Sequence, residues 1–321
     1  MSGEPQIGGL LDRLAIARFT NIGFKLNARS FAEPLDDMTG KTVVVTGATG
    51  GIGYAAAKRL AGLGAHVVVV GRSEPKLDAV TSELGGDVRG LQADLSLMAD
   101  IRALAETLLE TEARIDVLIN NVGVLLPERR LTSEGLEMSF ATNLAGHFLL
   151  TNLLLPRLIE SAPARIVNVT SGGMYSAKIR PDDLQFEQRE YSGTAAYASD
   201  KRGQVVLTEM WAERLAGTGV VCHVAHPGWA KTAGVQQSLP TFDKVMRPFL
   251  RTPEQGADTL VWLAAAGSPA TTSGDFWFDR EIAPTHMTAS TVETADDRRD
   301  LWETLVAVTG SDVELTASSQ P

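Results

Sequence analysis

Residues 46–53 read Thr46-Gly47-Ala48-Thr49-Gly50-Gly51-Ile52-Gly53. The β-branched run 41–45 before this stretch predicts a buried strand, and the alanine-rich run 54–60 after it predicts a helix. A strand, a glycine-rich turn and a helix in this order form the context in which such a turn binds a dinucleotide. We therefore take this stretch as the centre of a nucleotide-binding fold and interpret the rest of the chain around it.

The glycines of this stretch have different physical roles. Gly47 and Gly51 keep the turn tight because they carry no Cβ, and Gly53 lets a ligand or another backbone come close. The helix that follows directs its first N–H groups at the turn, which suits a pyrophosphate. The expected cofactor contacts here are Thr46, Gly47, Thr49, Gly50, Gly51, Ile52 and Gly53.

The composition narrows the class of protein. The chain has 321 residues, of which 44% are hydrophobic and 21% are charged, as in ordinary globular proteins. Its net charge of −10 disfavours nucleic acid as a partner. The single cysteine, Cys222, leaves no internal disulfide and favours a reducing compartment. No run of 18 apolar residues and no basic leader is present, so we expect a cytoplasmic protein.

Apolar strand-like runs alternate with helical patterns from residue 41 onward. This alternation predicts crossover connections, and therefore an α/β fold with a doubly wound parallel sheet and helices on both faces. No break in composition divides residues 40–310, which we expect to form one domain. Strands are expected at 41–46, 66–70, 87–92, 115–120, 165–170, 219–225 and 276–278, and helices at 51–63, 74–84, 97–112, 134–160, 195–215, 253–266 and 296–308.

Three further segments differ from this pattern. Residues 1–39 form an N-terminal extension with a partly helical pattern that includes Leu11, Ala15, Phe19 and Ile22. We interpret it as a helix packed on the domain or on a second subunit; contact of residues 10–30 with a membrane surface is the less favoured alternative, since the apolar face is small. Residues 229–252 mix apolar side chains with glycine and proline, which predicts a mobile apolar lid. The polar end 311–321 is expected to be disordered.

The end of the second strand indicates which cofactor is used. A dinucleotide-binding fold usually has an acidic residue there, which bonds the ribose 2′-OH. This chain has Gly71 followed by Arg72, and a guanidinium forms bidentate bonds with phosphate. We therefore expect NADP(H) in preference to NAD(H); the alternative is that Arg72 is only a solvated loop residue.

The next two strands also end in candidate cofactor contacts. Asp94 can accept a hydrogen bond from an adenine amino group and Leu95 can pack on the ring, although Asp94 could equally serve as a helix cap or turn residue. Asn121, Val122 and Gly123 end the fourth strand, where the amide can brace neighbouring loops and the glycine allows close approach of a cofactor.

Tyr197 and Lys201 are candidate catalytic residues. They lie four residues apart in a predicted helix and therefore share a face. A nearby ammonium favours the tyrosinate, whose ordinary pKa is about 10. Ser171 follows the fifth strand, at the edge of the sheet where ligands bind, and its hydroxyl can hold a substrate oxygen. For Asn143, a polar helix-surface role is the alternative to a catalytic one.

These residues together resemble the short-chain dehydrogenase/reductase superfamily, over about residues 40–285. The resemblance implies a Rossmann-type sheet of about seven strands, with Tyr197 as general acid/base and Ser171 orienting a carbonyl. It implies that Lys201 binds the nicotinamide ribose and lowers the pKa of Tyr197, and that Asn143 holds a water in a proton relay. The motifs are Thr46-Gly47-x-x-x-Gly51-x-Gly53, Asn120-Asn121-Val122-Gly123, Asn143, Ser171, Tyr197-x-x-x-Lys201 and Pro227-Gly228-Trp229-Ala230-Lys231-Thr232, in which Pro227, Gly228, Trp229 and Thr232 would contact the cofactor.

Two departures refine this resemblance. Val122 replaces the usual alanine, and the long interval from Ser171 to Tyr197 resembles the retinol-dehydrogenase-like branch. The chain is most similar to the dehydrogenase/reductase member 12 family, through Ser171-Gly172-Gly173-Met174, Asp183-Leu184-Gln185, Lys201-Arg202-x-Gln204 and His226-Pro227-Gly228-Trp229-Ala230.

The sequence therefore predicts an NADP(H)-dependent oxidoreductase acting on a carbonyl or alcohol group. The apolar lid and Met174-Tyr175 favour an apolar substrate such as a lipid aldehyde, a retinoid or a steroid. Assembly into a homo-oligomer is compatible with the sequence, and no metal-ligand spacing is present among the histidines. A non-catalytic NADP-binding sensor or scaffold and a sugar-nucleotide epimerase are the alternatives. The complete Ser-Tyr-Lys-Asn set disfavours the first, and the lack of a second substrate domain disfavours the other.

Overall fold

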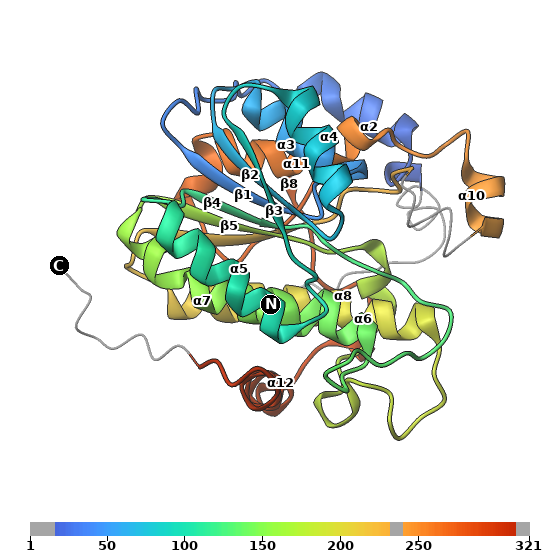
Figure 1. The fold of residues 1–321 in the computed structure, drawn as a ribbon. Helices are drawn as coiled ribbons and strands as arrows, with labels where there is room; N and C mark the ends of the chain where they lie inside the picture. The colour runs from blue at the N-terminus through green and yellow to red at the C-terminus, as the bar shows by residue number, and fades with distance from the viewer. Residues whose placement is uncertain (1–16, 232–239, 313–321) are drawn as a thin grey trace.

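An eight-stranded sheet runs through the protein in the order β3-β2-β1-β4-β5-β6-β7-β8 (Figure 1). The protein is described by a computed structural model, in which residues 17–231 and 240–312 are described. The first seven strands are parallel and β8 is antiparallel to β7. The strands are β1 Thr42–Thr46, β2 His66–Gly71, β3 Val88–Gln92, β4 Val117–Asn120, β5 Ala164–Val169, β6 Val220–Ala225, β7 Phe276–Phe278 and β8 Glu281–Ile282.

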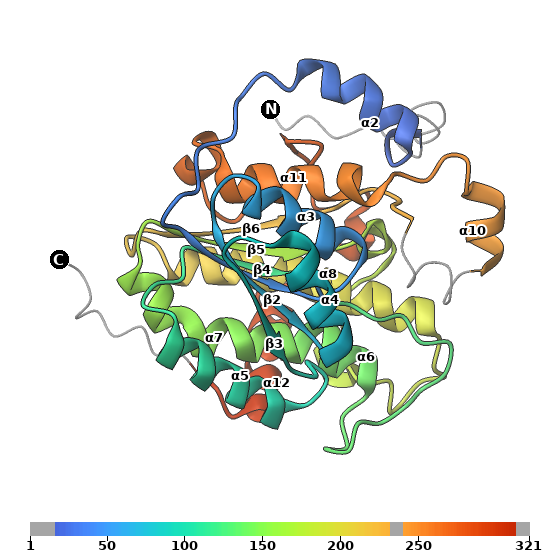
Figure 2. The ribbon, with the colours of Figure 1, turned by 45° about the horizontal axis from the view of Figure 1, so that its top comes forward.

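Helices cover both faces of this sheet, as Figures 1 and 2 show. On one face lie α3 (Gly51–Ala61), α4 (Glu74–Leu84) and α11 (Pro253–Ala265). On the other lie α5 (Met98–Thr111), α7 (Gly146–Glu160) and α8 (Gly193–Arg214), with α12 (Ala295–Thr309) packed outside them. The fold is thus the predicted α/β, Rossmann-type doubly wound sheet. Among the described helices, none is long and apolar enough to cross a membrane.

Alternate residues of the central strands enter two separate cores. Val43 and Val45 pack with α3 and α11, whereas Val44 packs with α5 and α7. Because both faces of a parallel sheet are covered, the strands are continuously apolar instead of alternating. The order of the strands reverses between β1 and β4, and ligands of such sheets bind beyond the carboxyl ends of the strands at this point.

The eighth strand differs from the expected count of about seven. Phe278 pairs with Glu281, so only Asp279 and Arg280 form the turn, and both have positive φ (52° and 62°). Such two-residue turns usually contain asparagine and glycine. Neither stands at positions 279 and 280, so the sequence did not indicate a hairpin there. An ion pair supports the strained turn. Arg280 donates to the carboxylate of Asp258 from both Nε (2.8 Å) and Nη2 (2.7 Å).

Short helices complete the described chain. α2 (Asn21–Asn27) follows the N-terminal segment and is capped by the Thr20 hydroxyl, which accepts from the backbone N–H of Gly23. α6 is Met138–Phe140, and α10 is Pro240–Met246. α10 lies within the segment 229–252, so part of the expected irregular lid is helical. The other short helical turns are η1 Ala28–Ser30, η2 Ala141–Ala145, η3 Gly172–Ser176, η4 Pro181–Asp183, η5 Ser268–Thr271 and η6 Ala289–Thr291.

Some sequence predictions concern residues outside the described ranges. These are the part of the N-terminal extension that includes Leu11 and Ala15, the expected cofactor contact Thr232, residues 232–239 of the lid and the end 313–321.

Candidate active site

The glycine-rich turn lies at the carboxyl end of β1, against the end of β4. Gly47 and Gly51 have positive φ (65° and 57°). A Cβ on Gly53 would lie 2.5 Å from Asn121 Nδ2 and 2.6 Å from the carbonyl oxygen of Gly47, so only glycine fits there. Gly50, at the start of α3, faces open space and offers no side-chain cap to the helix. The first N–H groups of α3 therefore form a site that suits a pyrophosphate.

Two of the predicted cofactor residues brace the turn. The hydroxyl of Thr46 accepts hydrogen bonds from the backbone N–H groups of Asn121 (2.9 Å) and Val122 (3.1 Å). The side-chain amide of Asn121 donates to the carbonyl oxygen of Thr46 (2.8 Å). These bonds join the ends of β1 and β4 and so fix the shape of the cradle, as the sequence predicted for the amide.

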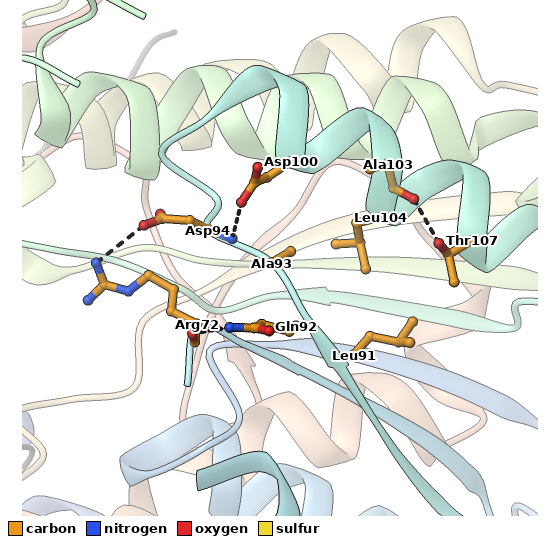
Figure 3. Close-up of a pocket in the computed structure, with 9 residues that line it drawn as sticks. All are labelled: Arg72, Leu91, Gln92, Ala93, Asp94, Asp100, Ala103, Leu104 and Thr107. Carbon is orange, nitrogen blue, oxygen red and sulfur yellow. Dashed lines mark hydrogen bonds and ion pairs between the residues drawn. The ribbon is translucent and has the colours of Figure 1, made fainter. Parts of the chain in front are cut away.

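A pocket of about 450 Å³ opens beside the ends of β2 and β3 (Figure 3). Arg72 and Asp94 face each other at its edge, with Arg72 Nη1 3.7 Å from Asp94 Oδ2. The arginine side chain is 64% exposed. Gln92 donates to the backbone carbonyl of Arg72 (3.0 Å), which anchors the start of the loop that carries the guanidinium. The pocket therefore presents a cation and a carboxylate where the adenosine half of a dinucleotide is expected.

Asp94 serves as a turn residue as well as a wall of this pocket. Its Oδ1 accepts from the backbone N–H and the hydroxyl of Ser96 (3.0 and 2.8 Å), while Oδ2 faces Arg72. Leu95 differs from its prediction, because its side chain is buried in the core. Leu91, Ala93 and Leu104 supply the apolar lining instead. Leu95 lies beyond β3, which ends at Gln92, so the strand pattern did not fix the direction of its side chain.

The packing around Gly71 also disfavours an acidic residue at the end of β2. A Cβ at this position would lie 2.6 Å from Thr49 Cγ2. A carboxylate at this strand end therefore could not be accommodated without moving Thr49. The contact with Thr49 therefore adds to the reasons for which a glycine suits the end of β2.

Ser171, Tyr197 and Lys201 come together at the carboxyl end of β5. Tyr197 forms a side-chain hydrogen bond with Ser171, and Lys201 Nζ lies 5.4 Å from the centre of the Tyr197 ring. Two bonds hold the lysine segment against the strand: the Thr170 hydroxyl donates to the carbonyl oxygen of Lys201 (2.7 Å), and Lys201 Nζ donates to that of Val169 (2.8 Å). The three side chains thus converge from β5 and α8.

Burial dominates the ionisation of this group. It raises the pKa of Tyr197 to about 12, although the bond with Ser171 acts in the opposite direction. Burial also lowers the pKa of Lys201 to about 7, against the attraction of Asp200. The pKa of Tyr197 thus lies above its ordinary value, whereas the resemblance implied that Lys201 lowers it. At neutral pH Tyr197 is protonated and can act as a proton donor.

Asn143 lies in η2, a π-helical turn between α6 and α7. Helical turns of this kind are frequent at functional sites. Its Oδ1 accepts from the backbone N–H of Val124 (2.8 Å), and its Nδ2 contacts the carbonyl oxygen of Val124 (2.8 Å) and Asp200 Oδ2 (3.0 Å). The side chain is fully buried and bonded to the protein, unlike the helix-surface amide considered from the sequence.

The loop after β6 and the N-terminal segment meet in an aromatic cluster of Phe19, His226, Trp229 and Phe278. The Phe19 ring centroid lies 4.8 Å from that of His226, 5.6 Å from that of Trp229 and 5.2 Å from that of Phe278. Trp229 donates its backbone N–H to the carbonyl oxygen of Phe19 (2.8 Å). The cluster lies beside Gly172, since a Cβ there would be 3.1 Å from His226 Nε2.

The aromatic cluster places an N-terminal residue next to Ser171, which the sequence did not predict. Gly228, in the same loop, has a φ of 74°, and a Cβ on it would overlap the guanidinium of Arg251. Phe19 was recognised only as part of a helical pattern, because its contacts are more than 150 residues away in the chain. Gln204 and His147 were also missed, although the position of Gln204 three residues after Lys201 on one helix face was a usable signal.

The described residues contain no cluster of potential metal ligands. Cys222 lies in β6, and its side chain has no solvent access. Burial raises the pKa of its thiol. The local chemistry therefore rests on the hydroxyls, the lysine and the amides around β5 and α8.

Comparison with known proteins places this geometry in a family. Residues 41–242 match the family model for the short chain dehydrogenase. The chain is 38% identical over 282 residues to dehydrogenase/reductase SDR family member 12 of Bos taurus, covering 85% of this chain and 87% of the relative. It is 41% identical over 247 residues to retinol dehydrogenase 12 of Bos taurus, covering 75% of this chain and 78% of the relative.

Solved structures show the same architecture. An uncharacterized protein from Mycobacterium Paratuberculosis superposes with a TM-score of 0.72 at 30% identity, covering 88% of this chain and 97% of that one. The RhlG/NADP active-site complex of Pseudomonas aeruginosa superposes with a TM-score of 0.63 at 26% identity, covering 76% of this chain and 96% of that one.

Proposed function

The chain belongs to the short-chain dehydrogenase family and is an NAD(P)-dependent oxidoreductase, and we propose that it transfers a hydride between NADP(H) and the carbonyl or alcohol group of an apolar substrate. The observation that carries this proposal is the convergence of Ser171, Tyr197 and Lys201 at the carboxyl end of β5. The hydroxyls and the ammonium lie where an open parallel sheet binds its ligands.

The residues around the glycine turn fit a dinucleotide. The uncapped first turn of α3 would hold the pyrophosphate, and Gly123 would admit the nicotinamide end, since a Cβ there would lie 3.3 Å from Lys201 Nζ. Pro227, Gly228 and Trp229 would border the same end. When bound, the cofactor supplies or accepts the hydride.

The proton would come from Tyr197 in the direction of carbonyl reduction. Burial keeps its hydroxyl protonated, with a pKa of about 12, so the group can donate to an alkoxide that forms beside it. Ser171 would hold the substrate oxygen by a hydrogen bond from the other side. Lys201 would contact the nicotinamide ribose through a donor that its bonds to Val169 and Gln204 leave free.

An apolar substrate is supported by the walls near Ser171. The aromatic cluster of Phe19, His226, Trp229 and Phe278 borders the η3 turn that follows Ser171. Phe249 of the segment 229–252 is partly exposed, and we propose that this segment acts as a lid over the substrate. One relative is named retinol dehydrogenase 12, which supports a retinoid among the apolar substrates that we propose, alongside a lipid aldehyde or a steroid.

The test of the activity is a screen of carbonyl compounds and alcohols, with NADPH or NADP⁺ followed by absorbance. Medium-chain and long-chain aldehydes, a retinoid and a steroid should be turned over faster than small polar carbonyls. Turnover restricted to small polar compounds would contradict the apolar-substrate proposal.

Arg72 should set the preference for NADP(H). Arg72→Ala should weaken NADPH binding by about ten- to a hundredfold, because a charge-assisted hydrogen bond is worth about 1.5–3 kcal/mol, and should leave NADH nearly unchanged. Fluorescence titration of both cofactors against wild type and variant measures this. The neighbouring Ser73→Ala is the matched control. Tighter binding of NADH than NADPH by the wild type would contradict the assignment.

A further inference from the structure

Gln204 stands one helical turn beyond Lys201, on the buried face of α8. Its Oε1 accepts a hydrogen bond from Lys201 Nζ (3.1 Å), and its Nε2 donates to the backbone carbonyl of Asn143 (2.7 Å). Nε2 also lies 2.7 Å from Nδ1 of His147. Each of these residues is buried. The carboxamide of Gln204 therefore bridges Lys201 and the backbone of Asn143.

The hydrogen-bond pattern fixes the orientation of each group. An ammonium has only donors, so the oxygen of Gln204 must face Lys201 and its amide hydrogens must face the two other partners. His147 then accepts at Nδ1 and carries its proton on Nε2, which donates to the carbonyl oxygen of Val122 (3.0 Å). Burial and Lys201 lower the pKa of His147 to about 3, in agreement with a neutral ring.

We propose that Gln204, oriented by His147, is a positioning residue that holds the ammonium of Lys201 for the cofactor and links it to the loop after β4. The bonds form one continuous path: Val122 carbonyl, His147, Gln204, Lys201. Val122 belongs to the same loop as Gly123, whose Cα lies beside Lys201 Nζ. A movement of that loop is therefore coupled to the position of Lys201. A carboxamide does not ionise, so Gln204 positions the lysine and is neither an acid nor a base.

The hydrogen bond from Lys201 to Gln204 should also stabilise the charged form of Lys201. Burial disfavours the ammonium, and an acceptor that bonds the charged form opposes that effect. The ionisable groups around Lys201 are Asp200 and Tyr197 on α8 and the neutral His147 on α7. Asp200 is the one negatively charged group among them, and two neutral oxygens, those of Val169 and Gln204, accept hydrogen bonds from the ammonium (2.8 and 3.1 Å).

The test measures the protonation of Lys201 in the protein without cofactor, so it does not depend on the proposed activity. Protein labelled with ¹³C at lysine Cε is titrated by NMR, and the Lys201 signal is assigned by its loss in Lys201→Arg. Gln204→Met keeps the length but removes the acceptor, so the midpoint should fall by about one to two pH units. Gln204→Glu places a negative acceptor there, so the midpoint should rise.

Thr151→Val is the matched control. Thr151 is also buried and lies one turn from His147 on α7, but its hydroxyl accepts from Asn120 instead (2.9 Å). This variant should leave the Lys201 midpoint where the wild type has it. A midpoint unchanged in Gln204→Met, or moved equally by Thr151→Val, would overturn the proposal. If Gln204→Met does not fold, Gln204→Glu decides: a midpoint equal to or below that of the wild type overturns it.

A second measurement separates this inference from the proposed function on which its cofactor part rests. At pH 8, Gln204→Met should bind NADPH about tenfold more weakly than the wild type, because more of its Lys201 is neutral. A shifted midpoint with unchanged NADPH affinity would support the link from Gln204 to Lys201. It would contradict the assumed contact between Lys201 and the cofactor.

Discussion

Asp200 lies directly before Lys201, and burial shifts the pKa of Asp200 in the opposite direction to that of Lys201. Burial raises its pKa to about 7, although the Ser139 hydroxyl and the Asn143 amide both donate to Oδ2 (2.7 and 3.0 Å). The unfolded carboxyl group has a pKa near 4. Between about pH 4 and pH 7 the folded protein therefore holds a proton that the unfolded chain has released, and the free energy of unfolding falls as the pH rises.

Asp200→Asn should remove this dependence on pH. Relative to the variant, the wild type should lose up to roughly 1.4 kcal/mol of unfolding free energy for each pH unit within that window. The loss of attraction to Lys201 acts in the same direction, since a lower pKa of the lysine makes the variant gain stability as the pH rises. Denaturant unfolding at pH 5 and pH 7 measures the difference. Parallel curves for the two proteins would show that Asp200 is ionised throughout.

The sequence predicted which residues form the site better than it predicted the surroundings of each residue. Motif spacing placed Ser171, Tyr197 and Lys201 together because consecutive turns of a helix and the end of a neighbouring strand have fixed geometry. It could not place Leu95 in the core, since this residue lies beyond the end of β3, where the alternation of strand faces no longer applies. Nor could it predict the pKa of Tyr197, which depends on burial by the whole fold.

Among the elements, the N-terminal segment is held by a buried ion pair. Arg251 bonds Asp279 through both nitrogens (2.5 and 2.9 Å), and both side chains are at most 1% exposed. Arg251 also donates to the carbonyl oxygens of Arg18 (2.6 Å) and Phe19 (3.2 Å). One guanidinium thus joins residues 18–20, the loop after β6 and the β7–β8 turn beside the aromatic cluster.

Asp279→Asn should lower the free energy of unfolding by about 3–5 kcal/mol, because it leaves a buried charge unpaired. Asparagine tolerates the positive φ at this position, so the change isolates the charge. Glu281→Gln is the control, since its ion pair with Arg18 lies in solvent and contributes little. Denaturant unfolding of the three proteins measures the effect. Equal stabilities of the two variants would contradict the role given to the buried pair.

The elements of the Rossmann-type sheet were predictable because their cores are periodic and their turns carry glycine. The helix predicted at 74–84 coincides with α4, and the strand predicted at 276–278 coincides with β7. The β7–β8 hairpin and α10 were not predicted. The hairpin uses Asp279 and Arg280 in place of glycine, and α10 begins at Pro240 in a segment whose composition indicates a loop.

At the scale of the whole molecule, one sheet brings together residues that are far apart in the chain. The glycine turn, the Arg72 pocket, the Ser171-Tyr197-Lys201 group and the N-terminal Phe19 all lie at the carboxyl ends of its strands. Ligands of open parallel sheets bind beyond the carboxyl ends of the strands, so this edge of the sheet was predictable from the alternation of strands and helices. The aromatic cluster beside the site was not predictable, because it joins Phe19 to residues more than 200 positions later in the chain.

The central claim is that this assembly reduces a carbonyl group with NADPH and that Tyr197 supplies the proton. The most direct measurement compares kcat and NADPH affinity of the wild type, Tyr197→Phe and the control Tyr54→Phe, with a substrate found in the screen. Tyr54 of α3 bonds Glu83 of α4 at the surface and should be dispensable. Tyr197→Phe should bind NADPH normally and lose about 10²–10⁴-fold in kcat. A Tyr197→Phe enzyme that keeps kcat within a few-fold of the wild type would contradict the account.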